Sequence, residues 1–377
     1  MTATPPSSDV SKPTPPAGGH RPRPVHRHCA VPPRLLERII RNGTSEQREW
    51  ALRTLSLDTT QRTVRVHNSL VTLWDAHRRP RHTPTPTPTP TTGLRRTIDD
   101  TAGSENLPGK TVRTEGQGPT SDVEATEAYD GLGATYTFYA DVFQRNSVDD
   151  HGLPLIASVH YGDHYDNAFW NGQQMVFGDG DGQLFNRFTV ALDVIGHELT
   201  HGVTQYEAGL AYLNQAGALN ESVSDVFGSL VKQYKLGQTA DEADWLIGAG
   251  LLAPGVQGVA LRSMKAPGTA FDDPTLGKDD QPAAMSGYVR TTEDNGGVHT
   301  NSGIPNHAFY LAAIALGGHS WEKAGRIWYE TLRSPRLKSN ATFAQFAALT
   351  VSQATTLFSS TESQAVSDAW KQVGIRA

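Results

Sequence analysis

The sequence has 377 residues, of which 37% are hydrophobic and 19% charged, so it is too long for one compact core and fits two globular domains with additional segments. Its net charge of −6 is unevenly distributed, because residues 1–96 carry +10 and residues 97–377 carry −16. A basic first part and an acidic remainder are expected to attract each other, although a merely solvated basic tail is the alternative. We expect no nucleic-acid partner.

The single cysteine, Cys29, excludes an internal disulfide. This fits a cytosolic protein, or an exported one that does not rely on oxidation. No apolar run is long enough to span a membrane, so we expect no membrane partner. The first 30 residues lack the apolar segment of a secretory signal peptide.

Residues 1–30 are rich in Pro, Gly and Ser/Thr and are predicted to be a disordered tail. After the Pro–Pro start of VPPRLLERIIRNG, apolar residues recur at helical spacing, and Asn42-Gly43 can end the helix. These apolar residues are Leu35, Leu36, Ile39 and Ile40. A second helix is predicted from about Glu46 to Leu57. The unit is too small for a robust core of its own, and we expect it to dock on the rest of the chain.

Alternating Thr and Pro in HTPTPTPTPTTG predict an extended linker. From Arg96 to about Phe188 the pattern is typical of short strands, with the runs TYTFYADVF, ASVHYG and NAFWNGQQMVFGDGDG. Within the last run, GDGDG is predicted to be a turn, because an EF-hand counted from Asp179 would have Val190 where its glutamate belongs. After Asp193 the pattern becomes helical. The predicted helices are 193–206, 219–235, 301–317, 320–333, 340–357 and 361–373.

The stretch DVIGHELTHGVTQY carries the first chemistry. His197 and His201 are four residues apart, so on a helix they share a face and can both bind one zinc ion. Glu198 lies beside them, close enough to act as a base on water at the metal. The motif is short, and ordinary helical histidines are an equally good interpretation of it alone.

A second stretch, GALNESVSDVFGSL, favours the metal site. Glu221 lies 24 residues after His197 and can complete a two-histidine, one-glutamate set that leaves one zinc position open. Asp225 can accept the other N–H of a ligand imidazole, and Asn220 can do the same for the second histidine. The alternative is a surface acidic helix.

HELTH, AGLAYLNQAGALNESVSD and DNGGVHTNSG together resemble the thermolysin family of neutral zinc metalloproteases, from about Arg96 to the C-terminus. VPPRLLERI resembles the short propeptide of the protealysin-like branch. The resemblance implies an α+β fold with a β-rich N-terminal half, an α-helical C-terminal half and the zinc site between them, preceded by a small helical propeptide. The implied segments are a tail (1–30), a propeptide (31–75), a linker (76–96), an N-terminal catalytic domain with the HELTH helix (97–206) and a C-terminal helical domain (207–377).

The same resemblance implies roles for individual residues. It gives His197, His201 and Glu221 as zinc ligands, Glu198 as the general base, Tyr212 and His299 as oxyanion donors, Asp294 as the partner that orients His299, and Asn167, Ala168 and Arg262 as contacts to the substrate backbone. A hydrophobic pocket for the residue after the scissile bond falls on Phe185, Phe188, Val194, Ile247 and Leu261. Any of these five could equally be plain core.

The sequence differs from thermolysin at the positions that bind calcium there. Positions that hold two calcium ions in thermolysin fall on Asp193, Lys232, Asp244, Leu246 and Ala249. Two carboxylates and a lysine cannot hold such a cation well, so a double calcium site is predicted absent, although calcium elsewhere is possible. We expect the Lys232 ammonium to neutralise Asp193 and Asp244; a lysine pointing into solvent is the alternative.

These inferences predict a zinc endopeptidase that uses a zinc-activated water to cut proteins and peptides before large hydrophobic residues. We expect a monomeric precursor that is inhibited by its own propeptide. The alternatives are an exopeptidase on the same metal site and a non-catalytic zinc-stabilised binding module. The family resemblance implies secretion, whereas the absence of a visible signal peptide leaves a cytoplasmic location or non-classical export open. Cys29 could cap the zinc as a thiolate, although lone cysteines more often have no such role.

Overall fold

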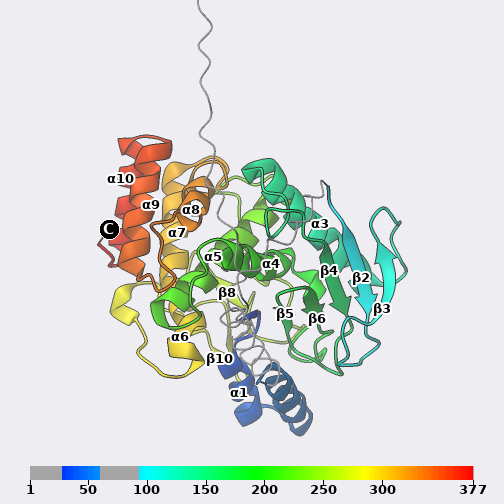
Figure 1. The fold of residues 1–377 in the computed structure, drawn as a ribbon. Helices are drawn as coiled ribbons and strands as arrows, with labels where there is room; N and C mark the ends of the chain where they lie inside the picture. Colours follow the sequence, from blue (N-terminus) through cyan, green and yellow to red (C-terminus); the bar gives the residue numbers. More distant parts are fainter. Residues whose placement is uncertain (1–27, 60–92, 377) are drawn as a thin grey trace, which may run out of the picture.

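The structure is a computed structural model that describes residues 28–59 and 93–376. The predicted disordered tail, up to residue 27, and most of the predicted Thr-Pro linker lie outside the described residues. Figure 1 shows strands β2, β3 and β4 on one side of the molecule and helices α7 to α10 on the other, with α4 and α5 between them. This arrangement confirms the predicted mixed N-terminal half and helical C-terminal half.

The largest sheet has the strand order β1-β5-β6-β4-β2-β3. Its strands are β1 (His28–Cys29), β2 (Arg96–Asp100), β3 (Lys110–Thr114), β4 (Leu155–Val159), β5 (Ala168–Trp170) and β6 (Met175–Phe177). Strand β4 runs parallel to β2 and β6, whereas the other pairs are antiparallel. Two small sheets pair β7 (Leu246–Ile247) with β8 (Arg262–Ser263), and β9 (Asp272–Asp273) with β10 (Gly277–Lys278). The first strand therefore comes from the region that precedes the predicted propeptide helices.

One element contradicts the sequence prediction. TYTFYADVF was expected to be a strand, but it forms the second half of helix α3 (Val123–Phe143). Asp122 caps this helix by accepting a hydrogen bond from the N–H of Ala125. The helix spans both cores of the protein: Leu132 packs with the sheet side, and Phe138 and Phe143 pack with the helical side. Packing of this long apolar face overrides the strand preference of its aromatic and β-branched residues.

The helical half agrees more closely with the sequence. Its helices are α4 (Leu192–Tyr206), α5 (Asn214–Leu236), α6 (Asp294–Asn301), α7 (Gly303–Leu316), α8 (Ala324–Leu332), α9 (Phe343–Leu357) and α10 (Ser360–Gln372), with short 3-10 turns η1 (Phe188–Val190) and η2 (Met285–Gly287). Helix α5 begins five residues before the predicted start at 219. None of the helices in the described ranges has both the length and the apolar character needed to cross a bilayer.

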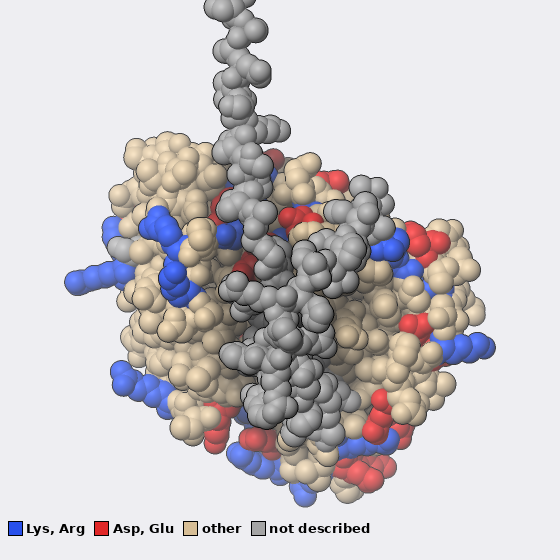
Figure 2. All heavy atoms as spheres, viewed as in Figure 1, with Lys and Arg blue, Asp and Glu red and all other residues tan. Residues whose placement is uncertain are grey.

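The residues from His28 to 59, called the front segment below, dock on the rest of the chain. The segment contains β1, helix α1 (Pro33–Asn42) and a further helix at residues 45–59. Leu35, Leu36 and Ile39 are buried, as the helical spacing predicted. Arg34 and Arg38 both form ion pairs with Asp280 of the body. Figure 2 shows acidic and basic side chains interspersed at the lower end of this face, where Figure 1 places α1.

Candidate metal centre

Helices α4 and α5 cross at a glycine contact that brings their polar side chains together. A Cβ atom on Gly228 of α5 would lie 2.3 Å from the backbone oxygen of Asp193 on α4. A Cβ on Gly196 would lie 3.0 Å from the Cα of Gly228. Only glycine allows this close approach of two helix backbones, and the approach sets His197 opposite Glu221.

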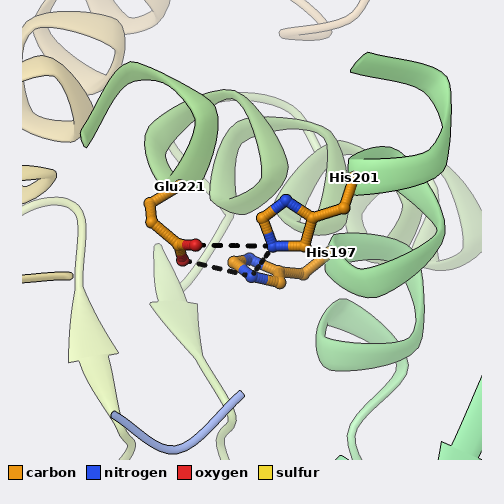
Figure 3. A group of neighbouring side chains, drawn as sticks. All are labelled: His197, His201 and Glu221. Atoms are coloured by element: carbon orange, nitrogen blue, oxygen red, sulfur yellow. Dashed lines mark hydrogen bonds and ion pairs between the residues drawn. The ribbon is translucent and has the colours of Figure 1, made fainter. Parts of the chain in front are cut away.

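The crossing gathers His197, His201 and Glu221 into one buried cluster (Figure 3). The two Nε2 atoms are 2.9 Å apart, and they lie 3.5 and 3.6 Å from the two carboxylate oxygens of Glu221. All three ligand atoms are within 4.8 Å of one another. Two imidazole nitrogens and one carboxylate oxygen at this spacing fit a tetrahedral zinc ion with one position left for water or substrate.

The outer nitrogens of both histidines are occupied by hydrogen bonds. His197 Nδ1 lies 2.8 Å from an oxygen of Asp225, and His201 Nδ1 lies 2.8 Å from the side-chain oxygen of Asn220. An Nδ1–H that donates in this way leaves the lone pair on Nε2, which faces the cluster centre. Ser224, which the sequence reasoning missed, lies 2.9 Å from His201 Nδ1.

Glu198 is buried next to the cluster but is not a member of it. The backbone N–H of Trp170, on β5, donates a hydrogen bond to Glu198 Oε2 at 3.0 Å. Oε1 is buried without a partner among the described residues. Burial raises the pKa of Glu198 to about 8, although the nearby His197 lowers it in part. The carboxyl group is therefore fixed in direction and close to the range in which a proton acceptor works at neutral pH.

Tyr212, His299 and Asp294 form a chain of polar contacts that reaches Glu221. Tyr212 Oη lies 3.1 Å from His299 Nε2 and also donates to Glu221. His299 Nδ1 and backbone N–H contact the two oxygens of Asp294 at 2.7 and 2.9 Å. Burial alone would lower the pKa of His299, but Asp294 and Glu221 raise it above its ordinary value.

The DNGG stretch makes this contact possible. Asp294, Asn295 and the two following glycines all have positive φ between 49° and 88°, although they fall within the bounds of α6. This left-handed run turns the chain so that the Asp294 carboxylate caps the following turn and meets the ring of His299.

Arg262 links the metal centre to the front segment. Its guanidinium donates to both oxygens of Asp225 at 2.8 and 2.9 Å, and to the backbone oxygen of Ala30 at 3.2 Å. Asn306, a second residue not foreseen from the sequence, donates to Asp225 at 2.8 Å. Asp225 is fully buried, and burial would raise its pKa, but Arg262 and His197 lower it below its ordinary value.

Asn167 and Ala168 also contact the front segment. The backbone N–H of Ala30 donates to Ala168 O at 3.0 Å, and strand β1 continues this antiparallel pairing. The N–H of Val31 donates to Asn167 Oδ1 at 2.9 Å. The three residues expected to bind substrate backbone are thus joined to residues 30–31.

The five predicted pocket residues are all buried, but they do not fall in one core. Phe185, Phe188, Val194 and Leu261 pack in the sheet-side core, which also includes Val31. Ile247 belongs to the helical core. Leu261 pairs with Ile247 through a backbone hydrogen bond of 3.0 Å, so the two groups adjoin at the strand pair β7–β8.

The Lys232 ammonium lies between the residues that correspond to the calcium-binding positions of thermolysin. Lys232 Nζ lies 2.9 Å from Asp193, 2.9 Å from Asp244 and 3.1 Å from the backbone oxygen of Leu246. Burial alone would lower the pKa of Lys232, but the two carboxylates raise it above its ordinary value. The side chain therefore points inward between the two aspartates.

Cys29 is not part of the metal cluster. It is 2% exposed and packs with Tyr161, Tyr165, Phe169 and Val176 in a small aromatic core. The idea of a thiolate cap on the metal has no support in this arrangement.

Residues 46–205 match the family model described as thermolysin metallopeptidase, catalytic domain, and residues 208–375 match thermolysin metallopeptidase, alpha-helical domain. An extracellular metalloprotease of Pectobacterium carotovorum subsp. carotovorum is 57% identical over 92% of this chain and 96% of its own length. A thermolysin of Alicyclobacillus acidocaldarius subsp. acidocaldarius is 43% identical over 67% of this chain and 46% of its own.

Among solved structures, the precursor of protealysin, a metalloproteinase from Serratia proteamaculans, matches with a TM-score of 0.82 and 57% identity. The match covers 92% of this chain and 99% of that one. The match therefore extends beyond the body at residues 93–376.

Proposed function

Because the chain belongs to the thermolysin family of zinc-dependent metalloendopeptidases, we propose that Glu198, Tyr212 and His299 carry out peptide hydrolysis beside a zinc held by His197, His201 and Glu221. The observation that carries the proposal is the buried His–His–Glu cluster with its outer nitrogens already bonded to Asp225 and Asn220. Zinc, when bound, supplies a Lewis acid that polarises a carbonyl oxygen and lowers the pKa of water.

The protein's own residues divide the remaining work. Glu198 takes the proton of the attacking water on Oε1, which has no partner among the described residues, and passes it to the leaving amine. Trp170 N–H holds the other oxygen and keeps the carboxylate aimed. Tyr212 Oη and a protonated His299 Nε2 donate hydrogen bonds to the developing oxyanion, and Asp294 favours the protonated ring.

We propose that the front segment inhibits the precursor by binding as a substrate would. Strand β1 runs antiparallel to β5, Ala30 N–H reaches Ala168 O, and Arg262 reaches Ala30 O. An extended chain added to the edge of a sheet uses the same backbone groups that a substrate would need. Removal of the front segment exposes those backbone groups to protein and peptide substrates. The similar protein whose structure was solved as a precursor supports activation by such a removal.

The apolar residues around β7, β8 and η1 support a preference for a large hydrophobic residue after the scissile bond. Phe185, Phe188, Val194, Ile247 and Leu261 would line that pocket. We also propose that Lys232 replaces the double calcium site, because its ammonium forms ion pairs with both Asp193 and Asp244.

The domain division we propose places the propeptide at 31–75, a linker at 76–96 and the change from the first to the second catalytic domain after Tyr206, at the end of α4. We propose that the chain acts outside the cell, a location that the name of the Pectobacterium relative gives for that protein. We also propose that it acts as a monomer. A non-catalytic binding module is not favoured, because the relatives are proteases.

A casein digest tests the function. The zinc-loaded full chain is expected to cut casein once its front segment has been removed, whereas Glu198→Gln should keep its zinc and lose about 10²–10⁴-fold in rate. Zinc content is measured in both proteins as the control. A processed, zinc-loaded wild type that leaves casein intact would contradict the proposal.

A further inference from the structure

Asp166 is a buried acid that the proposed chemistry does not use. It precedes Asn167, its side chain is 1% exposed, and neither carboxyl oxygen has a hydrogen-bond partner among the described residues. Burying a carboxylate without partners is strongly unfavourable, so such a group takes up a proton or a cation.

A second carboxyl group is carried by the neighbouring segment, because Gly180 N–H donates to Tyr165 O at 3.4 Å and these two residues directly precede Asp181 and Asp166. Asp181 Oδ1 accepts backbone N–H groups of residues 183, 184 and 185, at 2.9, 2.7 and 2.9 Å, whereas Oδ2 is buried without a partner in the described chain. Burial raises the pKa of Asp166 well above its ordinary value, and the charge of Asp181 raises it further. A weaker contact with the N–H of Asp181, which lacks the geometry of a hydrogen bond, opposes both effects.

The backbone holds the two acids together. Gly178 N–H donates to Asn167 O at 3.0 Å, and a Cβ atom on Gly178 would lie 2.0 Å from the backbone oxygen of Tyr165. The segments that carry Asp166 and Asp181 therefore cannot move apart without breaking this contact.

The helix at residues 45–59 of the front segment touches both of these segments. Thr54 Oγ1 accepts the N–H of Asp166 at 3.2 Å, and Asp58 accepts hydrogen bonds from Tyr165 and Asn167 at 2.5 and 2.9 Å. At the other acid, Gln47 donates to Gln183 at 3.1 Å. Thr54 and Asp58 are themselves buried, so the helix forms a cover over the acid pair.

We propose that Asp166 and Asp181 share one proton beneath the helix at residues 45–59, and that loss of this proton to water loosens the front segment. The protonated Asp166 donates to Asp181 Oδ2, which satisfies both orphan groups with one hydrogen bond. Ionisation places a second negative charge near the first, and undocking of the helix at residues 45–59 exposes both carboxylates to water.

The direction with pH follows from linkage. A carboxyl group whose pKa is raised in the docked state contributes fully to docking below its ordinary pKa. That contribution is lost as the pH rises through the raised value, so undocking becomes easier toward neutral and alkaline pH. This inference depends on the docking of the front segment and not on proteolytic activity.

Other titratable groups lie where this helix meets the body. Asp58 is on the helix itself, Glu46 is close to Gln183, Arg53 pairs with Asp163 and Glu105, and the ring of His164 stacks on Trp50. A substitution confined to residue 166 leaves these groups in place, so it isolates the contribution of the acid pair.

The test uses the full chain with Glu198→Gln, which prevents self-cleavage. In this background Asp166→Asn is expected to raise the melting temperature by at least about 2 °C at pH 8.5, with little change at pH 5.5, because an amide donates to Asp181 at every pH. Hydrogen exchange of residues 45–59, corrected for its intrinsic pH dependence, should slow in parallel. If Asp166→Asn fails to fold, Asp181→Asn is used in its place and should also raise the melting temperature at pH 8.5 with little change at pH 5.5.

Asp273→Asn is the matched control, because Asp273 is a buried aspartate that accepts backbone N–H groups of residues 257, 275 and 276. It should shift the melting temperature equally at both pH values. Parallel pH profiles for Asp166→Asn and its parent would overturn the proposal. Stabilisation of the parent by added calcium, lost in Asp166→Asn, would also overturn it and show a cation site instead.

Discussion

Asn167 and Val31 bind each other in both directions. The N–H of Val31 donates to Asn167 Oδ1 at 2.9 Å, and Asn167 Nδ2 donates to Val31 O at 3.2 Å. An amide side chain that binds backbone N–H and C=O groups in this way can bind peptides of different sequences. We therefore expect the same amide to hold a substrate backbone once the front segment has been removed.

This pairing predicts that Val31→Pro weakens inhibition. Proline has no N–H to donate, and one hydrogen bond is worth about 1 kcal/mol, so activity of the unprocessed chain on a fluorogenic peptide should rise by about 3–10-fold. Val31→Leu keeps the N–H and an apolar side chain, and serves as the control. Equal initial rates for the two variants would contradict the prediction.

Tyr212→Phe should lower kcat with little change in KM. Its hydroxyl group lies beside His299 and is expected to act on charge that develops only in the transition state, where one donor is worth about 10²–10³-fold. Tyr206→Phe, at the end of α4, is the matched control and should retain its rate. A rise in KM alone would show that Tyr212 binds the substrate without stabilising the oxyanion.

Asp225→Asn should weaken zinc binding by about 10–100-fold, because the carboxylate orients His197 and raises its basicity. Competition with a fluorescent zinc chelator measures the affinity. Asp294→Asn removes a carboxylate from His299, a histidine outside the metal cluster, and should lower turnover while zinc affinity stays within about twofold. Equal zinc affinities for Asp225→Asn and the wild type would rule out this supporting role.

Lys232→Ala should destabilise the fold. The side chain of Lys232 is 14% exposed, that of Asp193 is 2% exposed and that of Asp244 is 42% exposed, so we expect a loss of about 3 kcal/mol, the low end for breaking a buried pair. Urea unfolding measures the loss, and Lys235→Ala, exposed on the same helix, should change it little. Calcium-selective chelation should leave the wild type unaffected. A marked loss of wild-type stability on chelation, with zinc retained, would reveal a calcium site.

Local spacing explains why much of the centre could be predicted from the sequence. His197 and His201 share a helix face by periodicity alone, and the carboxylates of α5 follow the same rule. Helix α3 was mispredicted because its aromatic run is equally suited to a strand, and only packing between two cores decides. Contacts such as Trp170 N–H to Glu198 involve the backbone, which carries no residue-type signal.

The acid pair could not be predicted for a related reason. Asp166 and Asp181 are 15 residues apart in a region of short strands and turns, where register determines which side chains face each other. GDGDG lies outside the helices and strands, and Asp181 accepts the N–H groups of residues 183–185, which follow it. No residue pattern indicates that its second oxygen is buried without a partner among the described residues.

Because Cys29 is buried in the front segment, the reactivity of its thiol can be used to measure undocking of that segment. The thiol is the single one in the chain and lies in β1 against aromatic rings, so a reagent such as a disulfide dye cannot reach it while the strand stays paired. Each molecule in which β1 separates from β5 should release one equivalent of dye. Absorbance alone can then follow the opening of the enzyme in real time, with neither substrate nor zinc in the cuvette.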